Sequence, residues 1–464
     1  MRTYDLIIVG SGPGGYVAAI RAAHNGLKTA LVEKESKLGG TCLLRGCIPT
    51  KSLLHSADVL QTTRNAKAHG ITTGEVGFDF ARVQKARHKV VTKRAAGVAY
   101  LMKQNKIDVH TGTGHFKDAG TLVVTHGDGK TTLNAKHVIV ATGSVPKTLP
   151  SLKLDGRRVI TSDQALELAE PPASMLVLGA GAVGVEFASI YSRFGTECTI
   201  VEMLDRVLPI EDTEISAEVE KLLEKRRINI LTGTRLEKAV VGKESVVATV
   251  AGAKESTTIE AAVVLVAVGR APYPEGLGLD AIGLKPNDRG FIEVDELMRT
   301  KIDGVFAIGD VVPTPQLAHI ASAEAMLAVD QISGKKVEPI NYRHTPSCTY
   351  SDPEVGSAGL TERAAKEKGY TVKIGKFPFA ALGKARVMGN VDGFVKVVAD
   401  AQYDELLGVH IVGPRATDLI AEACVALRLE STTEELVHTI HAHPTLPEAV
   451  LEAAHAALGR ALHL

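Results

Sequence analysis

Short, wholly apolar runs that end close to a glycine recur along the chain and predict buried parallel strands. Residues 6–9 are followed by Gly10, and residues 175–178 are followed by Gly179. Three further runs have the same form: 138–141, 263–268 and 305–308. Strands covered by helices on both faces are continuous apolar runs, as in a parallel sheet. The pattern therefore predicts an α/β fold built on doubly wound sheets.

Alternating apolar and polar positions predict antiparallel strands elsewhere in the chain. Residues 121–125 and 131–133 flank the turn at 127–129, which predicts a hairpin packed on the first parallel sheet. Beyond about residue 341, strands are expected at 393–399 and 406–412. Helices are expected to follow, over 417–427 and from about residue 445. This change in pattern predicts a separate α+β domain at the C-terminus.

The chain contains an internal repeat. Gly10-x-Gly12-x-x-Gly15 returns as Gly179-x-Gly181-x-x-Gly184, and Glu33 returns at the same offset as Glu202. In such a fingerprint the first glycine permits a tight turn, and the second lets the backbone approach a pyrophosphate. The third glycine lets the helix pack closely on the strand, and the carboxylate accepts hydrogen bonds from a ribose. Two copies predict two dinucleotide sites in one chain.

Composition excludes several classes of protein. The chain of 464 residues has 53 basic and 53 acidic side chains, so no global field favours nucleic acid or an anionic membrane. No apolar run approaches the length of a membrane span. An apolar strand follows the first five residues directly, which leaves no room for a secretory signal. We therefore expect a cytoplasmic protein, or one that acts in an organellar matrix after processing.

Five cysteines are too few, and odd in number, for a secreted disulfide framework. Cys198, Cys348 and Cys424 stand singly in apolar surroundings, where a cysteine usually acts as a small buried apolar residue. Cys42 and Cys47 lie at the start of an expected helix and can form a small-loop disulfide, which in a cytoplasmic protein is more often redox-active than structural. A metal site would need two further ligands nearby, so we expect no metal.

Lys51 and the segment at 441–448 each have two interpretations. Lys51 shares a helix face with Cys47, where it would favour a thiolate, but it could equally be a solvated helix residue. In the segment His441-Ala-His443-Pro444-Thr445-Leu-Pro447-Glu448, Thr445 and Glu448 have the spacing of a capping box that opens the last helix. A second interpretation of this segment, as a histidine base with an orienting carboxylate, comes from the family resemblance given next.

The segment Gly39-Gly-Thr-Cys42-Leu-Leu-Arg-Gly-Cys47-Ile-Pro-Thr-Lys51, placed after a dinucleotide fingerprint, resembles the pyridine nucleotide–disulfide oxidoreductases, and the likeness extends essentially from end to end. It implies two Rossmann-like domains and a C-terminal α+β dimerisation domain. The expected divisions are an FAD domain at 1–145, an NAD domain at 146–272, a central domain at 273–342 and an interface domain at 343–464. Leu44-Arg45 replaces the commoner Asn-Val, which puts the lining of the cleft in doubt.

The resemblance also implies roles for the candidate catalytic residues. Cys42 would exchange with the thiol substrate, and Cys47 would form a charge-transfer contact with the flavin. Lys51 would pair with Glu186 beside the flavin ring. His443 would take the thiol proton, with Glu448 orienting it. In the family this base comes from the partner subunit, so a homodimer with shared sites is implied.

The same resemblance assigns cofactor-binding positions, with Glu33 on the FAD ribose and Gly309-Asp310 on the ribitol. The expected FAD residues are Gly10, Gly12, Gly14, Gly15, Glu33, Lys34, Gly40, Thr41, Lys51, Gly114, Thr142, Gly143, Gly309, Asp310 and Ala318. The expected residues for the nicotinamide cofactor are Gly179, Gly181, Val183, Gly184, Glu186, Glu202, Leu236 and Gly269.

Glu202 favours NAD over NADP, because a carboxylate at the strand end accepts a 2′-hydroxyl and repels a 2′-phosphate. Arg206 is the first arginine after it, too far along to bind that phosphate. This disfavours glutathione reductases. No cysteine follows Cys424, which disfavours mercuric reductases and large thioredoxin reductases, and a soluble transhydrogenase would lack the cysteine pair.

The function that the resemblance implies is oxidation of protein-bound dihydrolipoamide to lipoamide, with electrons passing through a Cys42–Cys47 disulfide and FAD to NAD. The expected partners are lipoyl-bearing subunits of 2-oxo acid dehydrogenase complexes or of the glycine cleavage system. Two alternatives are another flavin disulfide reductase, resembling glutathione or mercuric reductase, and a non-catalytic flavoprotein scaffold. In a scaffold, Cys42, Cys47 and His443 could be replaced without consequence.

Overall fold

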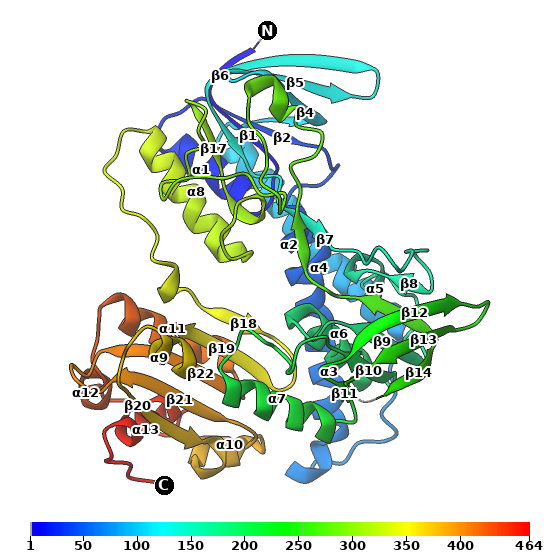
Figure 1. Ribbon diagram of the computed structural model, residues 1–464, viewed down its shortest axis with the longest axis vertical. Coiled ribbons are helices and arrows are strands. Elements are labelled where there is room, and N and C mark those ends of the chain that lie inside the picture. The colour runs from blue at the N-terminus through cyan, green and yellow to red at the C-terminus, as the bar shows by residue number, and fades with distance from the viewer. Residues whose placement is uncertain (1, 254) are drawn as a thin grey trace. The chain divides into compact units, whose positions relative to one another are not determined.

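A computed structural model describes residues 2–253 and 255–464, which group into two compact units (Figure 1). The first unit comprises the chain up to Leu53 together with Ala81–Lys147 and Arg270–Ile340. The second comprises Leu54–Phe80, Thr148–Gly269 and Asn341–Leu464. The four-domain division predicted from the sequence is finer than this grouping and remains a prediction. None of the helices in the described ranges is long and apolar enough to cross a membrane.

The first unit is built on one mixed sheet whose parallel part has the order β3-β2-β1-β6-β17. Its strands are β1 (Arg2–Val9), β2 (Thr29–Glu33), β3 (Asp108–Thr111), β4 (Thr113–Asp118), β5 (Thr121–His126), β6 (Gly129–Val140) and β17 (Val305–Ala307). A two-stranded ribbon joins β7 (Ser144–Pro146) to β16 (Arg270–Pro272). The apolar runs predicted as buried strands are confirmed, since every residue from Leu6 to Val9 is buried.

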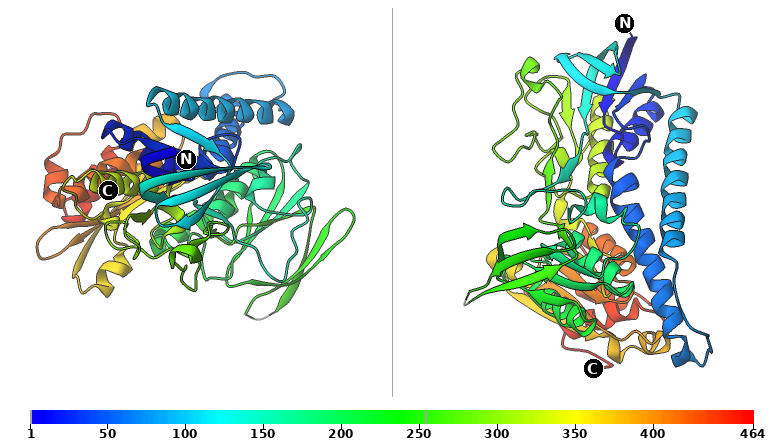
Figure 2. Two further views of the ribbon diagram at one scale, coloured as in Figure 1. Left: turned by 90° about the horizontal axis from the view of Figure 1, so that it is seen from above. Right: turned by 90° about the vertical axis from the view of Figure 1, so that its right-hand side faces the viewer.

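The predicted hairpin exists and packs on the parallel sheet as expected, since Leu122 and Val124 share one apolar core with Val32. The first half of β6 pairs antiparallel with β5, and its second half pairs parallel with β17. One continuous strand therefore carries the hairpin as an extension of the same sheet, visible near the N-terminus in Figures 1 and 2. The apolar run at 138–141 did not show that its strand begins nine residues earlier, at Gly129.

Helices cover this sheet and connect its strands. They are α1 (Pro13–His24), α2 (Gly40–Arg45), α4 (Phe80–Gln104) and α8 (Ala318–Ile332), with short 3₁₀ turns at Leu279–Ile282 and Gly309–Val311. α1 packs against α8, and both contribute to an apolar core that includes Ala18, Ala22, Ala325 and Ala328. The helix α3 (Cys47–Arg64) begins in the first unit and ends in the second, and a 3₁₀ turn at Ala66–His69 follows it.

The second unit repeats the β-α-β arrangement in a parallel sheet of order β11-β10-β9-β15-β8. Its strands are β8 (Val159–Ile160), β9 (Ser174–Leu178), β10 (Glu197–Val201), β11 (Asn229–Leu231) and β15 (Val263–Val266). Its helices are α5 (Ser162–Ala165), α6 (Ala182–Arg193) and α7 (Thr213–Lys225). A separate antiparallel sheet comprises β12 (Arg235–Val241), β13 (Val246–Ala251) and β14 (Ser256–Ala261), and its apolar side chains share a core with the parallel sheet.

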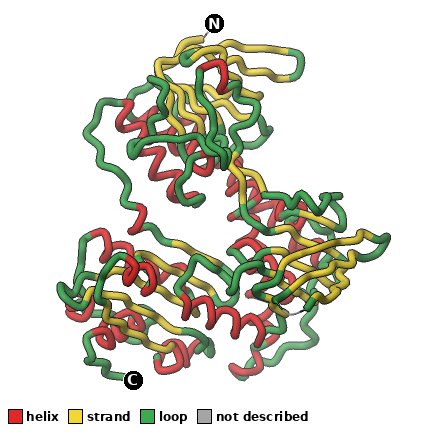
Figure 3. Tube along the Cα trace, in the orientation of Figure 1, coloured by secondary structure: helices red, strands yellow, loops and turns green. Residues whose placement is uncertain are grey.

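The C-terminal part of the second unit is an antiparallel sheet with helices, as the sequence pattern predicts (Figure 3). Its strands, in the order β18-β19-β22-β21-β20, are β18 (Ser347–Thr349), β19 (Glu354–Gly359), β20 (Val372–Pro378), β21 (Phe394–Asp400) and β22 (Leu406–Gly413). Its helices are α9 (Glu362–Glu367), α10 (Gly383–Met388), α11 (Ala416–Arg428), α12 (Thr433–His438) and α13 (Glu448–Ala457). The predicted α/β class with an α+β C-terminal part is confirmed.

Candidate active site

The first fingerprint forms the turn between β1 and α1, and its three glycines meet different requirements. Gly10 has a φ of 105°, and a Cβ there would lie 2.3 Å from the Ala141 carbonyl oxygen. A Cβ on Gly15 would lie 1.8 Å from the Gly10 carbonyl oxygen. A Cβ on Gly12 would lie 4.0 Å from the Gly40 Cα and would meet no closer atom of the described residues. Packing therefore requires the outer glycines, while the middle one leaves the backbone open to a ligand at the N-terminus of α1.

Glu33 is fixed at the end of β2 by hydrogen bonds from the fingerprint turn. Its carboxylate accepts the Ser11 amide at 2.8 Å, the Ser11 hydroxyl at 2.6 Å and the Glu35 amide at 2.9 Å. The Ser11 hydroxyl in turn accepts the Gly39 amide at 3.1 Å. Sequence reasoning missed Ser11, which occupies a variable position of the fingerprint. The carboxylate is thus oriented before any ribose binds.

The second fingerprint reproduces this geometry between β9 and α6. A Cβ on Gly179, whose φ is 105°, would lie 2.5 Å from the Ala267 carbonyl oxygen, and one on Gly184 would lie 1.9 Å from the Gly179 carbonyl oxygen. Among the described residues, no atom lies within 4 Å of a Cβ placed on Gly181. Glu202 accepts the Ala180 amide at 2.7 Å and the Leu204 amide at 2.8 Å. Both copies therefore present an open middle glycine and a preoriented carboxylate.

The residues after β6 and β17 carry a polar cluster in the first unit. The buried Thr142 hydroxyl has no hydrogen-bond partner in the described part of the chain. Ser144 donates to the Asp310 carboxylate at 2.5 Å and accepts from the Arg270 guanidinium at 2.7 Å. Sequence reasoning missed Ser144 and Arg270. A buried hydroxyl without a partner and a carboxylate held by Ser144 are the kinds of group that fit a ligand rich in hydroxyl groups, such as the ribityl chain of FAD.

The N-terminus of α8 is not capped by a side chain, which is compatible with the predicted cofactor role of Ala318. Ala318 is the first residue of this helix, and Leu317 before it has no side-chain acceptor to cap the free amides. The Gly309 amide donates to the fully buried Glu324 at 2.6 Å, which fixes the turn before the helix. Sequence reasoning also missed Glu324, since no local pattern marks a carboxylate in the middle of an apolar helix.

The remaining cofactor positions lie on the same two frameworks. Lys34 lies over the Tyr273 ring at 4.1 Å, and a Cβ on Gly40 would lie 2.5 Å from the Gly12 Cα. The others are Gly14 in α1, Thr41 in α2, Gly114 on β4, Gly143 after β6 with a φ of 73°, Val183 in α6, Leu236 on β12 and Gly269 with a φ of 105°. Their roles remain predictions.

Cys42 lies in α2 and Cys47 is the first residue of α3, and both are present as thiols. A hydrogen bond with Cys47, burial and the charge of Cys47 raise the pKa of the Cys42 thiol, while Lys51 acts in the opposite direction. In this reduced state the raised pKa holds the proton on Cys42. No group of three or more His, Cys, Asp or Glu side chains in the described residues could hold a metal ion.

The departure at Leu44-Arg45 is accommodated locally. Leu44 is partly buried against the apolar core of the first unit. The Arg45 guanidinium donates to the Glu35 carboxylate at 2.6 Å, with both side chains 39% exposed. This pair ties the cysteine segment to the residues that follow Glu33. The substitution therefore adds a surface contact and leaves both thiols in place.

His443 and Glu448 form a hydrogen-bonded pair in the second unit. The Nδ1 atom of His443 lies 2.8 Å from the Glu448 carboxylate, and the histidine side chain is 78% exposed. Because the carboxylate accepts the Nδ1 proton, Nε2 is left as the basic nitrogen. Burial opposes the ionisation of Glu448, but hydrogen bonds from the Thr445 amide and from His443 lower its pKa below the ordinary value. The arrangement is that of a base with an orienting carboxylate.

The predicted capping box at Thr445 is wrong. Helix α13 begins three residues later, at Glu448, with Pro447 at its N-cap. The Thr445 hydroxyl donates to the Ala442 carbonyl at 2.6 Å and does not cap the helix. Of the two hydrogen bonds of a capping box, the one from the Thr445 amide to the Glu448 carboxylate is present, at 2.7 Å. The other carboxylate oxygen is thereby available to His443.

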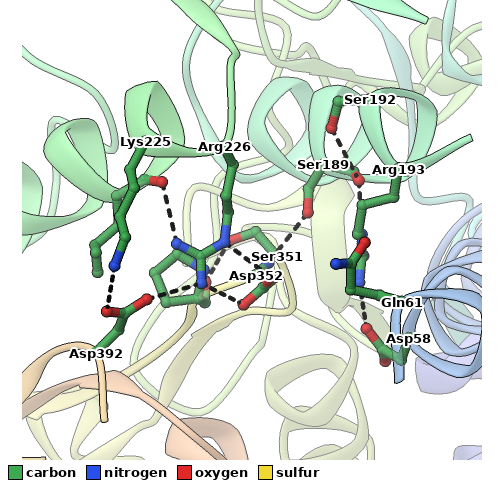
Figure 4. A network of polar contacts seen from close by, with 12 residues as sticks. Asp58, Gln61, Ser189, Ser192, Arg193, Lys225, Arg226, Ser351, Asp352 and Asp392 are labelled. Atoms are coloured by element: carbon green, nitrogen blue, oxygen red, sulfur yellow. Dashed lines mark hydrogen bonds and ion pairs between the residues drawn. The ribbon is translucent and has the colours of Figure 1, made fainter. Parts of the chain in front are cut away.

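Glu186 is buried on α6, and its carboxylate accepts the Tyr350 amide at 3.0 Å. Figure 4 shows a network that holds α6 against the loop containing Tyr350 and Asp352. The Asp352 amide donates to the Ser189 hydroxyl at 3.1 Å, and Arg226 binds the Asp352 carboxylate through two nitrogens. The expected pairing of Glu186 with Lys51 remains a prediction, because the two residues belong to different units.

Three comparisons with known proteins bear on this site. A family model described as pyridine nucleotide-disulphide oxidoreductase matches residues 4–325, and the model of its dimerisation domain matches residues 345–454. The chain is 48% identical, over an alignment 471 positions long, to the dihydrolipoyl dehydrogenase of Bacillus subtilis (strain 168), covering 99% of each protein. It is 40% identical to the mitochondrial dihydrolipoyl dehydrogenase of Pisum sativum, over 99% of this chain and 92% of that protein. The crystal structure of LpdA from Mycobacterium tuberculosis is similar with a TM-score of 0.90 at 26% identity, over 98% and 99% of the two chains.

Proposed function

The chain belongs to the pyridine nucleotide-disulphide oxidoreductases, and within that family we propose that it is a dihydrolipoyl dehydrogenase with FAD and NAD as cofactors. It oxidises dihydrolipoamide to lipoamide. The observation that carries the proposal is the pair of interacting thiols at Cys42 and Cys47, directly after the first dinucleotide fingerprint. Full-length relatives named dihydrolipoyl dehydrogenase support the choice within the family.

The two fingerprints fit two dinucleotides of different chemistry. The open backbone at Gly12, the carboxylate of Glu33 and the orphaned Thr142 hydroxyl would hold FAD. The open backbone at Gly181 and the carboxylate of Glu202 would hold NAD, since Glu202 repels a 2′-phosphate. When bound, FAD couples a dithiol, which gives up electrons through sulfur, to a nicotinamide that accepts hydride at carbon.

The chain's own residues perform the thiol chemistry. Nε2 of His443 takes the proton of one dihydrolipoamide thiol, and the resulting thiolate attacks the Cys42 sulfur of the Cys42–Cys47 disulfide. That bond breaks, and Cys47 leaves as a thiolate. The second substrate thiol then attacks the substrate sulfur of the mixed disulfide and gives its proton to the departing Cys42 sulfur, which releases lipoamide and the Cys42 thiol. The substrate dithiol is oxidised, and the enzyme disulfide is reduced by the same electron pair.

Retention of the proton on Cys42 suits this sequence of steps. The Cys42 sulfur leaves the mixed disulfide as a thiol, because its pKa is raised in the reduced pair. The negative charge then lies on Cys47, near the cation of Lys51. We assign Cys42 to exchange with substrate and Cys47 to electron transfer on this basis.

The dimerisation-domain match at residues 345–454 indicates a homodimer. We propose that His443 and Glu448 of one subunit serve the cysteines of the other, so that each active site is shared. Lipoyl-bearing subunits of 2-oxo acid dehydrogenase complexes or of the glycine cleavage system are the proposed partners. We propose that the enzyme acts in the cytoplasm or, after processing, in an organellar matrix, in keeping with bacterial and mitochondrial relatives.

Steady-state turnover tests this function. The purified holoenzyme is assayed with dihydrolipoamide and NAD, in parallel with dihydrolipoamide and NADP, and with NADPH and glutathione disulfide. Rapid NADH formation that is lost with NADP supports both the substrate and the role of Glu202. A dominant glutathione reaction would contradict the substrate assignment. In the Cys47→Ser variant, lipoamide turnover should be lost while FAD stays bound.

A further inference from the structure

The segment that carries His443 contains a second histidine in a different environment. Residues 439–447 connect α12 to α13 without regular structure. The side chain of His441 is only 5% exposed, whereas that of His443 is 78% exposed. His441 therefore points into the protein, and the two histidines on either side of Ala442 differ in what they contact.

Both ring nitrogens of His441 are hydrogen-bonded. Nδ1 lies 2.8 Å from the Thr439 carbonyl oxygen, and Nε2 lies 2.7 Å from a carboxylate oxygen of Glu422 on α11. A carbonyl oxygen can only accept, so Nδ1 carries a proton. An ionised carboxylate also only accepts, so Nε2 carries one too. The contacts thus describe an imidazolium paired with Glu422.

Electrostatics agree with this protonation state. The hydrogen bond with Glu422 raises the pKa of His441 above its ordinary value against the effect of burial, and the charge of Glu448 acts in the same direction. The charged groups that act on His441 are thus Glu422 from α11 and Glu448 from α13. The end of α12 contributes the Thr439 carbonyl, not a charge.

We propose that His441, anchored by Glu422, is the positioning residue that holds the His443 segment for proton transfer from the thiol substrate. The anchor fixes the middle of the segment to α11, while the Thr445 amide and hydroxyl fix its far end through Glu448 and Ala442. Between these two anchors, Glu448 orients His443 through its hydrogen bond to Nδ1. The proposal rests on the proposed function, in which His443 is the base.

Variants at Glu422 test the anchor with a matched control. Glu422→Ala removes the acceptor, whereas Glu422→Gln keeps a hydrogen bond to either protonation state of His441. Glu434→Ala is the control, because Glu434 also pairs with a histidine, His438, but at 3.5 Å on an exposed helix face. The Glu434 and Glu422 side chains are similarly exposed, at 36% and 29%.

Each holoenzyme is assayed with dihydrolipoamide and NAD, and separately with NADH and ferricyanide, which bypasses His443. Glu422→Ala should lower the dihydrolipoamide kcat by about tenfold or more, because a small displacement of a catalytic group costs rates of that order. The ferricyanide rate and FAD content should stay within about twofold, and Glu422→Gln should recover most of the loss. Glu434→Ala should match the wild type. A dihydrolipoamide rate in Glu422→Ala close to that of the control would overturn the proposal, as would a parallel loss of both activities.

The pH dependence separates the imidazolium from a neutral histidine. The raised pKa means that the ion pair is intact below the ordinary histidine pKa and is lost as the pH rises through the raised value. The amide of Glu422→Gln can donate to neutral His441, so its anchor survives at high pH. The ratio of the Glu422→Gln rate to the wild-type rate should therefore rise with pH, and a flat or falling ratio contradicts the ion pair.

A readout independent of turnover keeps this proposal distinct from the proposed function. Hydrogen exchange of the backbone amides in residues 439–446 should accelerate in Glu422→Ala and return towards wild type in Glu422→Gln. If the wild type fails to oxidise dihydrolipoamide, the proposed function is wrong, yet this exchange pattern still tests the anchor. Unchanged exchange in Glu422→Ala would show that His441 does not hold the segment.

Discussion

Glu448 accepts the Nδ1 proton of His443 at 2.8 Å with one carboxylate oxygen and the Thr445 amide at 2.7 Å with the other. The same side chain therefore selects the tautomer of the base and fixes the segment that carries it. A carboxylate in this position leaves Nε2 unprotonated and stabilises the imidazolium that forms when a thiol is deprotonated.

Replacement of Glu448 by glutamine should lower the dihydrolipoamide kcat by about a hundredfold, the order expected when a general base loses its correct protonation state. The NADH–ferricyanide rate should be unchanged. Glu452→Gln is the matched control one helical turn further along α13, because Glu452 binds His463 at 2.7 Å and not the base. Equal rates in the two variants would remove Glu448 from the mechanism.

The same substitution in the two fingerprints should produce two different defects. Glu33→Gln removes the charged acceptor of the first copy and should weaken FAD retention, measured as flavin absorbance per chain after gel filtration. Glu202→Gln should leave FAD content intact and raise the KM for NAD by about tenfold, with a smaller effect on kcat, because a charged hydrogen bond to a ribose is worth about 1.5–3 kcal/mol. Loss of FAD from Glu202→Gln would contradict the assignment of the second fingerprint to NAD.

These nucleotide sites could be predicted from sequence because each requirement is local. Gly10 and Gly15 are separated by one turn, and a side chain at either would strike backbone within that turn or in the adjacent strand. Glu33 lies at the end of the next strand, where its carboxylate reaches the Ser11 amide. The spacing of these residues along the sequence is therefore enough to predict the geometry of the nucleotide sites.

Contacts between distant segments could not be predicted in this way. Ser144 bonds Asp310 across 166 positions and Arg270 across 126, and no periodicity links such residues. The start of α13 was missed for a different reason. Thr445 has the right spacing for a capping box, but its hydroxyl donates to the Ala442 carbonyl, so the helix begins at Glu448. Several side-chain arrangements satisfy one local pattern, and packing selects among them.

The Cys42 thiol should become more reactive when Cys47 is replaced by serine. The hydrogen bond with Cys47 is the largest cause of the raised pKa of Cys42, and the negative charge of Cys47 adds to it. Both effects vanish or weaken in Cys47→Ser, so the Cys42 pKa should fall and more thiolate should exist at neutral pH. Alkylation of Cys42 by iodoacetamide in the reduced enzymes, followed by peptide mass spectrometry, measures this change. Slower labelling in the variant would show that the proton of the reduced pair is not retained on Cys42.

The buried cation Lys396 should contribute strongly to the stability of the second unit. Its side chain is 1% exposed, and its ammonium nitrogen lies 2.9 Å from Asp212 and 2.8 Å from both Glu214 and Glu362. Lys396→Met leaves the buried Asp212 without its counter-charge and should lower the free energy of unfolding by about 3–5 kcal/mol. Lys376→Met is the matched control, because Lys376 also binds Glu214 but is 43% exposed and should change stability by about 0–1 kcal/mol.

The pH dependence of this effect has a defined sign. Burial opposes the ionisation of Asp212, but the hydrogen bond from Lys396 and nearby positive charge hold its pKa below the ordinary value. A carboxylate with a depressed pKa stabilises the fold above its unfolded-state pKa, and this contribution is lost as the pH falls through the folded-state value. The difference between wild type and Lys396→Met in urea unfolding should therefore shrink on acidification from neutral pH. A difference that grows towards acid pH would show that Asp212 is not the group that Lys396 stabilises.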